Sequence, residues 1–551
     1  MLSRSSVLWS NSLFIIFLLL IFSFESFNSL YSQSSQPNPD SIPFAPAVSY
    51  PTGNGPVSVF CADLDTFPGM DLAVANNHSN DVSILMNNGD GTFYLDSSYG
   101  AGDQPRWVFC VDLDGDLDLD LAVANYNYPN GNVSILKNNG DGTFQTKDDY
   151  EAGDSPASIF CADLDGDTDL DLAVANWVSP YVTILKNYGD GTFYLDSNYA
   201  VGSWPTCVFC ADLDGDDDLD LAVANEADNN ISILMNNGNG TFDTAVNYPV
   251  GINPTSVFCA DLDTFPGMDL AVANYSVNVS ILMNQGNGTF DTAVNYPAGE
   301  HPYYIFCADL DWDLDLDLAV ANQYSNNISI LKNNGDGTFQ TKVDYDVGSQ
   351  PWSIFCSDLD EDSDLDIAVT NYFINKVTIL LNQISRPNSY SLIFPLNADS
   401  VKTPVNLKWQ NSIDPDPNDT VRYDLYLSRS IIFNPDSTIV YNSLLDTTYT
   451  DSLDLKLWYW KVKAKDKWGA VRWSDQTWSF YVYLCGDCNG DGKITVSDVI
   501  CEINYLFKGG SAPVPLIAGD VNCDGKETVS DVVYLINYLF KGGPKPCKDC
   551  P

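Results

Sequence analysis

The sequence has 551 residues, of which 74 are Asp or Glu and 25 are Lys or Arg, so the formal net charge is −49. A chain of this length exceeds one ordinary hydrophobic core, and several domains are expected. The acidic excess argues against nucleic-acid binding, because a phosphate backbone requires a basic surface. The aspartates are clustered at regular intervals, and such clusters of carboxylates suit hard cations such as Ca²⁺.

Residues 1–32 have the composition of an export signal. Arg4 supplies a basic start, and residues 13–24 are almost wholly apolar before polar residues follow. This apolar run is short for a membrane span, and no second run follows it. We therefore expect a secreted or cell-surface protein without a membrane span after signal removal. An uncleaved anchor is the alternative, because no A-x-A cleavage site is present.

Residues 43–384 contain seven copies of a unit of about 49 residues. Each copy has a Phe-Cys pair, and the cysteines fall at positions 61, 110, 161, 210, 259, 307 and 356. Asp-Leu-Ala-Val-Ala-Asn or a close variant follows, and then a Gly-rich turn in most copies. The pattern gives four short strands per copy, which predicts a seven-bladed β-propeller. The equivalent cysteines are expected to be buried, unpaired thiols.

The seventh copy lacks its fourth strand, and the missing segment is found ahead of the first copy. Residues 44–53 match residues 242–251 of the fourth copy. The N-terminal segment is therefore predicted to complete the seventh blade and close the ring.

These units resemble FG-GAP/VCBS repeats, the blades of integrin-like propellers. That resemblance implies calcium binding by alternate aspartates in the turn between the first two strands of a blade. The residues that match the motif are Asp112, Asp114, Asp116, Asp120, Asp163, Asp165, Asp167, Asp171, Asp212, Asp214, Asp216, Asp220, Asp309, Asp311, Asp313, Asp317, Asp358, Asp360, Asp362 and Asp366. The family's glycine at the sixth loop position is absent from all of them.

The first and fifth copies depart from this motif. Both read Asp-Leu-Asp-Thr-Phe-Pro-Gly-Met-Asp, over residues 63–71 and 261–269, and lack the middle carboxylate. We expect these two turns to bind calcium weakly or not at all. In the other copies we expect the ion to rigidify the turn rather than to take part in catalysis.

The face of the propeller opposite these turns carries the residues that differ most between copies. Aromatic side chains there suit a glycan or a protein ligand. The candidates are Trp107, Tyr126, Trp177, Trp204, Tyr303, Tyr324, Trp352 and Tyr372. An asparagine from each copy is expected beside them, at positions 76, 125, 176, 225, 274, 322 and 371. Packing between blades or filling of the ring is the alternative for several of the aromatic residues.

Catalysis has little support in the sequence. There are two histidines, His78 and His301, and no nucleophile elbow, zinc-protease helix or phosphate loop. We expect a non-catalytic binding or adhesion protein. A polysaccharide lyase or glycoside hydrolase on the same scaffold, and a purely structural surface protein, remain alternatives.

Residues 389–483 show a different all-β pattern. The segments 405–409, 423–427 and 459–464 alternate apolar with polar residues, and this stretch contains no cysteine. The pattern predicts a β-sandwich and resembles a fibronectin type III or related Ig-like module, for which a spacer role is expected.

Residues 484–551 contain an internal duplication with a spacing of 33 residues. The two twelve-residue segments, 487–498 and 520–531, have the ligand spacing of EF-hand loops, with glycine at position six and aspartate at position twelve. The predicted ligands are Asp487, Asn489, Asp491, Lys493, Thr495 and Asp498, and Asp520, Asn522, Asp524, Lys526, Thr528 and Asp531, with the lysines contributing their backbone carbonyls. Each loop leads into a helix that ends at a Gly-Gly pair.

Two half EF-hands in this arrangement resemble a type I dockerin, whose family partner is a cohesin domain. The resemblance implies cohesin contacts by Val496, Ser497, Val529 and Ser530, in two equivalent orientations. Glu527 departs from the apolar residue usual at its position. Six cysteines in this segment favour disulfides, with fifteen possible pairings and a zinc site as the alternative.

Overall fold

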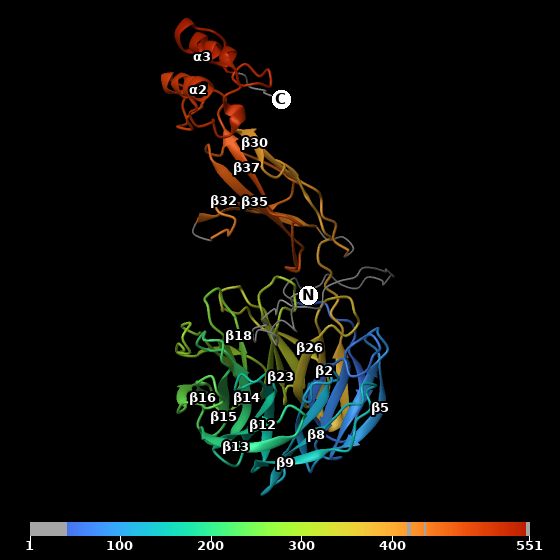
Figure 1. Ribbon diagram of the computed structural model, residues 1–551. Coiled ribbons are helices and arrows are strands. Elements are labelled where there is room, and N and C mark those ends of the chain that lie inside the picture. The colour runs from blue at the N-terminus through green and yellow to red at the C-terminus, as the bar shows by residue number, and fades with distance from the viewer. Residues whose placement is uncertain (1–40, 416–419, 435–436, 547–551) are drawn as a thin grey trace, which may run out of the picture. The chain divides into compact units, whose positions relative to one another are not determined.

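The repeated sequence folds into repeated sheets. The computed structural model describes residues 41–415, 420–434 and 437–546 (Figure 1). It divides into two units at Ile384, and each unit is described separately. Within the described ranges, no helix combines the length and the apolar character that a bilayer crossing requires. The predicted export signal, residues 1–32, lies outside the described residues.

The first unit consists of seven four-stranded antiparallel sheets, one for each copy of the repeat. The first three sheets contain β2 (Pro56–Ala62), β3 (Asp71–Asn76), β4 (Asp81–Asn87) and β5 (Phe93–Gly100); β6 (Pro105–Val111), β7 (Asp120–Asn125), β8 (Gly131–Leu136) and β9 (Asp148–Gly153); and β10 (Pro156–Ala162), β11 (Asp171–Asn176), β12 (Tyr181–Asn187) and β13 (Phe193–Ala200).

The remaining four sheets contain β14 (Pro205–Ala211), β15 (Asp220–Asn225), β16 (Asn230–Leu234) and β17 (Val246–Pro249); β18 (Pro254–Ala260), β19 (Asp269–Asn274), β20 (Asn278–Leu282) and β21 (Val294–Pro297); β22 (Pro302–Ala308), β23 (Asp317–Asn322), β24 (Asn327–Leu331) and β25 (Val343–Asp346); and β26 (Pro351–Ser357), β27 (Asp366–Asn371), β28 (Lys376–Leu380) and β1 (Val48–Pro51). A short 3₁₀ helix, η1 (Tyr372–Ile374), joins β27 to β28.

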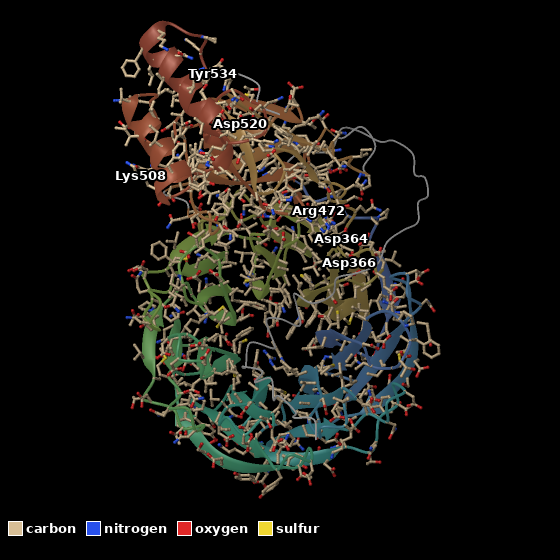
Figure 2. The ribbon with its side chains drawn as sticks, turned by 45° about the horizontal axis from the view of Figure 1, so that its top comes forward. Asp364, Asp366, Arg472, Lys508, Asp520 and Tyr534 are labelled. Carbon is tan, nitrogen blue, oxygen red and sulfur yellow. A yellow bond between two sulfur atoms is a disulfide. The ribbon has the colours of Figure 1, made fainter. Side chains whose placement is uncertain are left out.

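A circuit of phenylalanines connects the first strands of the seven sheets. It is formed by the Phe of each Phe-Cys pair, whose ring lies 4.6–5.3 Å, centroid to centroid, from the ring in the next sheet. Phe355 of the seventh sheet contacts Phe60 of the first, so the circuit returns to its starting point. In Figure 2 the strands of this unit follow one another around a common centre. This arrangement fits a propeller.

A second circuit is made of hydrogen bonds between neighbouring sheets. An asparagine at or just after the end of the third strand donates from Nδ2 to a leucine carbonyl of the preceding sheet, over 2.8–2.9 Å in all seven cases. Asn87 of the first sheet donates to Leu359 of the seventh at 2.8 Å. These buried bonds join the sheets where side-chain packing alone would allow sliding.

The N-terminal segment completes the seventh sheet, as the sequence predicts. β1 pairs antiparallel with β28, with Val48 opposite Ile379, and Phe44 forms a further bridge to Asn382. The Ser49 and Thr378 hydroxyls lie 2.8 Å apart across this pairing. The first sheet therefore keeps its own four strands, and the seventh obtains its fourth from the other end of the repeat region.

The second unit begins with a two-sheet β region. One sheet contains β29 (Leu392–Phe394), β31 (Val405–Trp409) and β34 (Thr448–Asp451), and the other contains β30 (Asp399–Lys402), β37 (Trp478–Tyr483), β35 (Leu457–Lys465), β32 (Arg422–Ser428), β33 (Ile439–Leu444) and β36 (Val471–Trp473). The alternating residues of β31, β32 and β35 bury Trp409, Leu425 and Trp460 in one shared core. This agrees with the predicted sandwich architecture.

The C-terminal region holds two helices of equal length, α2 (Val496–Lys508) and α3 (Val529–Lys541), with a short 3₁₀ helix, η3 (Leu516–Ala518), between them. Each helix begins with a capping box, made by Thr495 with Asp498 and by Thr528 with Asp531. Each ends at a left-handed glycine, as predicted from the Gly-Gly pairs.

Candidate functional site

The first candidate site is the set of turns between the first and second strands of the seven sheets. We call these turns aspartate loops one to seven, with positions one to nine, and they comprise residues 63–71, 112–120, 163–171, 212–220, 261–269, 309–317 and 358–366. In loops two, three, four, six and seven, the position-one carboxylate accepts a hydrogen bond from the position-six amide over 3.0–3.1 Å. The position-five carboxylate accepts one from the position-seven amide over 3.0–3.1 Å.

The missing glycine at position six does not prevent this geometry. The residues at this position adopt φ between 71° and 81°, a left-handed conformation that non-glycine residues rarely take. They are Leu117, Thr168, Asp217, Leu314 and Ser363. All five loops that were predicted to bind calcium therefore share one strained backbone conformation.

The position-three carboxylates have the feature expected of metal ligands. In these same five loops, Oδ1 of that aspartate is buried and has no hydrogen-bond partner, at Asp114, Asp165, Asp214, Asp311 and Asp360. A buried carboxylate oxygen without a donor is costly unless a cation occupies its lone pairs. Aspartates of loops two, three and four also bring three ligand atoms within 4.8 Å of one another. The donor set fits Ca²⁺, which prefers oxygen ligands.

Loops one and five differ at this position. Oδ1 of Asp65 accepts a hydrogen bond from the Phe67 amide at 2.6 Å, and Asp263 and Phe265 repeat this bond. The oxygen that is unpaired in the other loops is thus satisfied within the turn. Three carboxylates still converge in each of these loops, so weak or absent binding there stays a prediction.

A fifth aspartate in each of the five loops is not among the predicted ligands. It occupies position seven and is Asp118, Asp169, Asp218, Asp315 or Asp364. Asp364 is 2% exposed, and neither of its carboxylate oxygens has a hydrogen-bond partner (Figure 2). Burial, followed by the charges of Asp362 and Asp366, raises its pKa well above the ordinary value. The alternation of aspartates at odd positions was the signal that could have identified it.

The position-nine aspartates have a structural role besides any contact with an ion. Asp120 accepts from the Asn138 amide at 2.8 Å and from the Leu113 amide at 3.2 Å, and so ties its loop to the third strand. Burial raises the pKa of Asp120 to about 7 despite these two bonds. Asp220 makes both equivalent bonds and Asp171 only the one from Asn187, and burial raises the pKa of each to about 7.

The second candidate site is formed by aromatic residues of different sheets around Arg106. Its guanidinium carbon lies 4.9 Å from the ring centroid of Tyr126 and 5.6 Å from that of Trp352. The Nη2 atom of Arg106 donates a hydrogen bond to the Tyr303 hydroxyl. Tyr303 and Trp352 have ring centroids 4.4 Å apart, and Trp352 stacks on Tyr372 at 5.1 Å. Four of the predicted ligand-binding residues, Tyr126, Tyr303, Trp352 and Tyr372, thus gather around an arginine that was not among the predicted site residues.

Two further predicted residues extend this group. Trp177 lies 5.8 Å from Tyr126 and stacks at 5.0 Å on Trp204, which is 45% exposed. The Trp177 indole donates to the Glu226 carboxylate at 3.0 Å. A ring stack with one open face beside a fixed acceptor is suited to the apolar face and hydroxyls of a sugar.

The other two predicted aromatic residues behave differently. Trp107 contacts Tyr304 of the sixth sheet at 5.5 Å and packs against the hydrophobic core, in agreement with the alternative of ring filling. Tyr324 is 51% exposed and lies 4.1 Å from the His301 ring. Tyr275 lies 6.3 Å from Tyr324 and 6.4 Å from Tyr303, and so connects Tyr324 to the residues around Arg106.

The repeated asparagines do not lie on this surface, contrary to the prediction. All seven, at positions 76, 125, 176, 225, 274, 322 and 371, have no exposed area. In six of them the side-chain amide donates to a serine or threonine of the third strand, as in the 2.8 Å bond from Asn125 to Ser134. In the seventh, Asn371 accepts from Thr378. They hold the second and third strands together and are unavailable to a ligand.

The cysteines of the repeat agree with the prediction. Each is buried and free, and burial raises the thiol pKa well above its ordinary value, as at Cys161 and Cys259. Cys207 and Cys210 belong to different hydrophobic clusters and do not form a redox pair.

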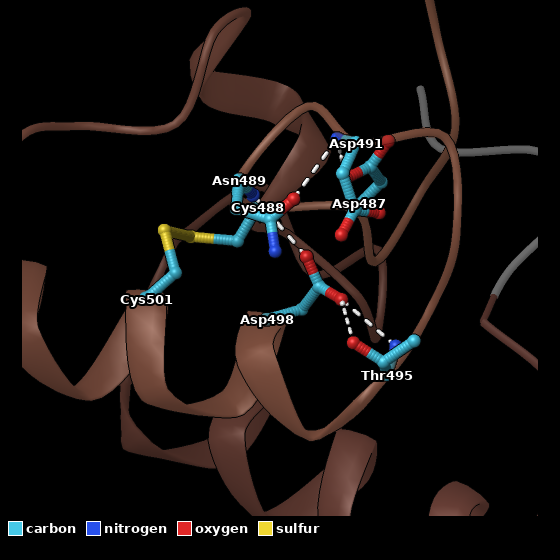
Figure 3. Close-up of a disulfide and its surroundings, with 7 residues drawn as sticks. All are labelled: Asp487, Cys488, Asn489, Asp491, Thr495, Asp498 and Cys501. Atoms are coloured by element: carbon cyan, nitrogen blue, oxygen red, sulfur yellow. Dashed lines mark hydrogen bonds between the residues drawn. A yellow bond between two sulfur atoms is a disulfide. The ribbon is translucent and has the colours of Figure 1, made fainter.

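The third candidate site is the pair of loops that precede α2 and α3. In the first, Asp487 accepts from the Asp491 and Gly492 amides at 3.0 and 2.8 Å, and Asp498 accepts from the Thr495 amide at 2.8 Å (Figure 3). The second loop repeats these bonds to within 0.1 Å, through Asp520 and Asp531. The predicted side-chain ligands at positions one and twelve are thus held in matching geometry in both halves.

The surface of this region is nearly symmetric. Val496, Ser497, Val529 and Ser530, the predicted partner contacts, are all exposed. Further apolar residues at matching positions of the two helices are also exposed, namely Ile500, Phe507, Val533 and Phe540. The helical spacing places each set along one side of its helix.

The interior of this region is not symmetric. Cys488 and Cys501 form a disulfide with a Cα–Cα distance of 5.9 Å, whereas Val521 and Tyr534 occupy the matching positions of the second half (Figure 3). Cys523 is also disulfide-bonded. These bonds confirm the predicted use of cysteine in this segment; Cys547 and Cys550 lie outside the described residues.

A second asymmetry concerns two glutamates. Glu502 is fully buried and Glu527 partly so, and none of their carboxylate oxygens has a hydrogen-bond partner. Burial, followed by the charge of Glu527, raises the pKa of Glu502 to about 8. The matching positions of the other half hold Leu535 and Ile494, which pack in the apolar core. The predicted disturbance at Glu527 therefore involves a second glutamate.

Comparisons with known proteins agree with these sites. A model of the FG-GAP-like repeat matches residues 69–123, 112–174, 212–264 and 313–369, and a model of the dockerin type I domain matches residues 485–540. No curated protein is matched by the sequence.

Solved structures with a similar fold include three that share little sequence with this chain. BBS1N in complex with ARL6DN is 12% identical, covers 62% of this chain and 96% of its own, and gives a TM-score of 0.46. An Agrocybe aegerita lectin that recognises non-reducing terminal N-acetylglucosamine is 21% identical, covers 60% of this chain and 86% of its own, and gives a TM-score of 0.40. Virginiamycin B lyase from Staphylococcus aureus is 13% identical, covers 62% of this chain and 100% of its own, and gives a TM-score of 0.45. From the two family matches, the chain contains FG-GAP-like repeats and a type I dockerin domain.

Proposed function

We propose that this chain is an extracellular calcium-binding protein that holds a glycan on a seven-bladed propeller and is anchored by its dockerin. The dockerin carries this proposal, because such a domain implies attachment to a cohesin partner. The two closed circuits of contacts support seven blades in one ring. The unpaired position-three oxygens support calcium in loops two, three, four, six and seven. The sandwich of residues 389–483, which follows the repeats and precedes the dockerin in the sequence, acts as a fibronectin type III-like spacer.

The glycan assignment depends on the Trp177–Trp204 stack. Trp204 is 45% exposed, and the Trp177 ring on which it stacks donates a hydrogen bond to Glu226. Ring stacking supplies affinity for a sugar, and the carboxylate supplies an acceptor for its hydroxyls. A protein ligand would instead use the aromatic residues beyond this stack, such as Tyr324, which is 51% exposed.

The ligand is tested with the full chain on a glycan array in the presence of calcium. We expect binding to a defined glycan class, a loss of at least about tenfold in affinity for Trp204→Ala, and no change for Tyr188→Ala. Tyr188 is a matched control, because it is an exposed aromatic residue at a turn after a third strand, away from the stack. Binding to no glycan contradicts the assignment, and release of products from a polysaccharide would replace it with an enzymatic function.

The anchoring function is tested with a recombinant type I cohesin. We expect calcium-dependent binding that survives replacement of Val496 and Ser497 alone, or of Val529 and Ser530 alone, and is lost when all four are replaced. This follows from the near-identical exposed faces of the two helices. Loss of binding with either pair alone would contradict two equivalent orientations.

A further inference from the structure

The residue that precedes each asparagine of the second circuit lies behind an aspartate loop and is a lysine in three sheets and an apolar residue in four. In chain order these residues are Met86, Lys137, Lys186, Met235, Met283, Lys332 and Leu381. In six sheets this side chain lies against a glycine of the following sheet's turn, as Lys137 does at Gly191 and Met235 does at Gly288. The position is therefore structurally equivalent in lysine-bearing and apolar sheets.

Each of the three lysines contacts the position-three aspartate of its own loop. Lys332 lies 3.0 Å from Oδ2 of Asp311, and Lys137 lies 3.1 Å from Oδ2 of Asp114. Lys186 pairs with Asp165 in the same way. The other oxygen of each aspartate, Oδ1, is the buried one without a partner. The lysine thus pairs with one oxygen of the predicted ligand and leaves the other oxygen, Oδ1, available to an ion.

The acidic residues follow the same division. Loops two, three and six contain five aspartates and have a lysine behind them. Loops four and seven have Met235 or Leu381 behind them and contain a sixth acidic residue, Asp217 or Glu361. The two kinds of loop therefore differ by two unit charges around otherwise matching ligands. Such a difference acts directly on the affinity for a divalent cation.

We propose that the lysines Lys137, Lys186 and Lys332 create two affinity classes of calcium site in one ring. Loops four and seven form the tight class, and loops two, three and six form a weaker class that fills at higher calcium concentration. This inference rests on the proposed calcium function of the loops. It gives the ring two states of occupancy, with loops four and seven holding calcium before the other three.

Loop six offers a direct measurement of the weaker class. Trp312 occupies its fourth position, and no other aspartate loop contains a tryptophan. Terbium emission sensitised by Trp312 in the full chain therefore reports occupancy of this loop, and displacement by calcium gives its affinity. We expect Lys332→Met to lower the calcium concentration at half-displacement by about tenfold. The substitution introduces the residue that three other sheets carry at this position, so the fold accommodates it.

Lys342→Met is the matched control. It removes the same charge from the same sheet, but Lys342 pairs with Asp344 on the outer strand and does not contact the loop. We expect no shift for this variant. Equal shifts for both variants, or none for Lys332→Met, would overturn the two-class inference. Absence of Trp312-dependent emission, with Trp312→Phe as reference, would instead refute calcium binding by loop six.

The reverse substitution tests the tight class. Met235→Lys places a lysine behind loop four, next to Asp214. Calorimetric titration of the full chain should then show one fewer tight site than the unchanged protein. An unchanged number of tight sites, with a native melting transition, would contradict the role of lysine.

Discussion

Replacement of Asn87 by alanine tests whether the seven sheets close into one ring. Asn87 is 7% exposed and its side chain makes three hydrogen bonds: to the Leu359 carbonyl at 2.8 Å, to the Met70 carbonyl at 3.0 Å and from the Gly89 amide at 2.9 Å. The first of these joins the first sheet to the seventh. The other two fix the turn that presents it.

The expected cost is large for one polar side chain. Leaving the buried Leu359 carbonyl without a donor costs about 1–3 kcal/mol, and each of the other two bonds contributes about 1 kcal/mol. We expect Asn87→Ala to lower the free energy of unfolding by about 3–5 kcal/mol. Asn88→Ala should cost about 0.5 kcal/mol, because Asn88 is exposed and bonds only within its own turn.

Urea unfolding at fixed calcium concentration, followed by tryptophan fluorescence, measures these differences. Asn236→Ala supplies the decisive reference, because Asn236 makes the same bond, at 2.9 Å to Leu164, between two sheets that are consecutive in the chain. In a closed ring both substitutions have similar costs. A cost for Asn87→Ala no greater than for Asn88→Ala, alongside a full cost for Asn236→Ala, would mean that the first and seventh sheets are not joined.

Three further predictions follow from the loops and the C-terminal region. Leu117→Gly should stabilise the protein by about 1 kcal/mol in urea unfolding, because Leu117 is exposed and held at φ 78°. Glu502→Leu combined with Glu527→Ile should raise the melting temperature in chelator, because it replaces two unpartnered carboxyl groups by the apolar pair of the other half. Burial raises the pKa of Asp366 to about 8, above its unfolded value, so the stability that this group contributes to the calcium-free protein is lost as pH rises towards 8. Calorimetry in chelator should therefore show a melting temperature that falls from pH 5 to pH 8, and saturating calcium should oppose this trend because it binds the ionised carboxylates.

The sheets and the origin of the missing strand could be predicted because both depend on local pattern. Four strand segments recur in the first six copies and three in the seventh, and residues 44–53 carry the pattern of a fourth strand ahead of the first copy. The pairing of β1 with β28 confirms that reading. The Phe-Cys marker was recognised in the sequence, but the role of its phenylalanine depends on the distance between neighbouring sheets. That distance is a tertiary property.

The Arg106 group could not be predicted, for a different reason. Arg106 has no counterpart in the other copies, and its hydrogen-bond partner Tyr303 is 197 residues away. Only the closure of the repeat brings β6 and β22 close enough for this contact. The sequence predicts several aromatic residues on one face, but it does not indicate which of them are in contact.

The error over the asparagines has a physical explanation. A residue that is identical in every copy serves what every copy needs, and here that need is the bond between the second and third strands. Ligand contacts are needed once and should differ between copies, as Trp177 and Glu226 do. Repetition therefore indicates a structural role for Asn125 and its equivalents, whereas their position at the ends of the second strands alone predicts a place on the binding surface.

The C-terminal region is symmetric at its surface but not in its interior. Its exposed positions match in both halves: Val496 with Val529, and Phe507 with Phe540. The differences are internal, and include the Cys488–Cys501 disulfide and the paired glutamates. A partner that contacts only the surface would meet nearly the same residues in either orientation. The interior nevertheless differs between the two halves, because the Cys488–Cys501 disulfide has no counterpart at Val521 and Tyr534 and the unpartnered carboxyl groups of Glu502 and Glu527 replace an apolar pair. Symmetry on the surface therefore determines how a partner can bind, whereas the internal differences act on stability and leave the two exposed faces alike.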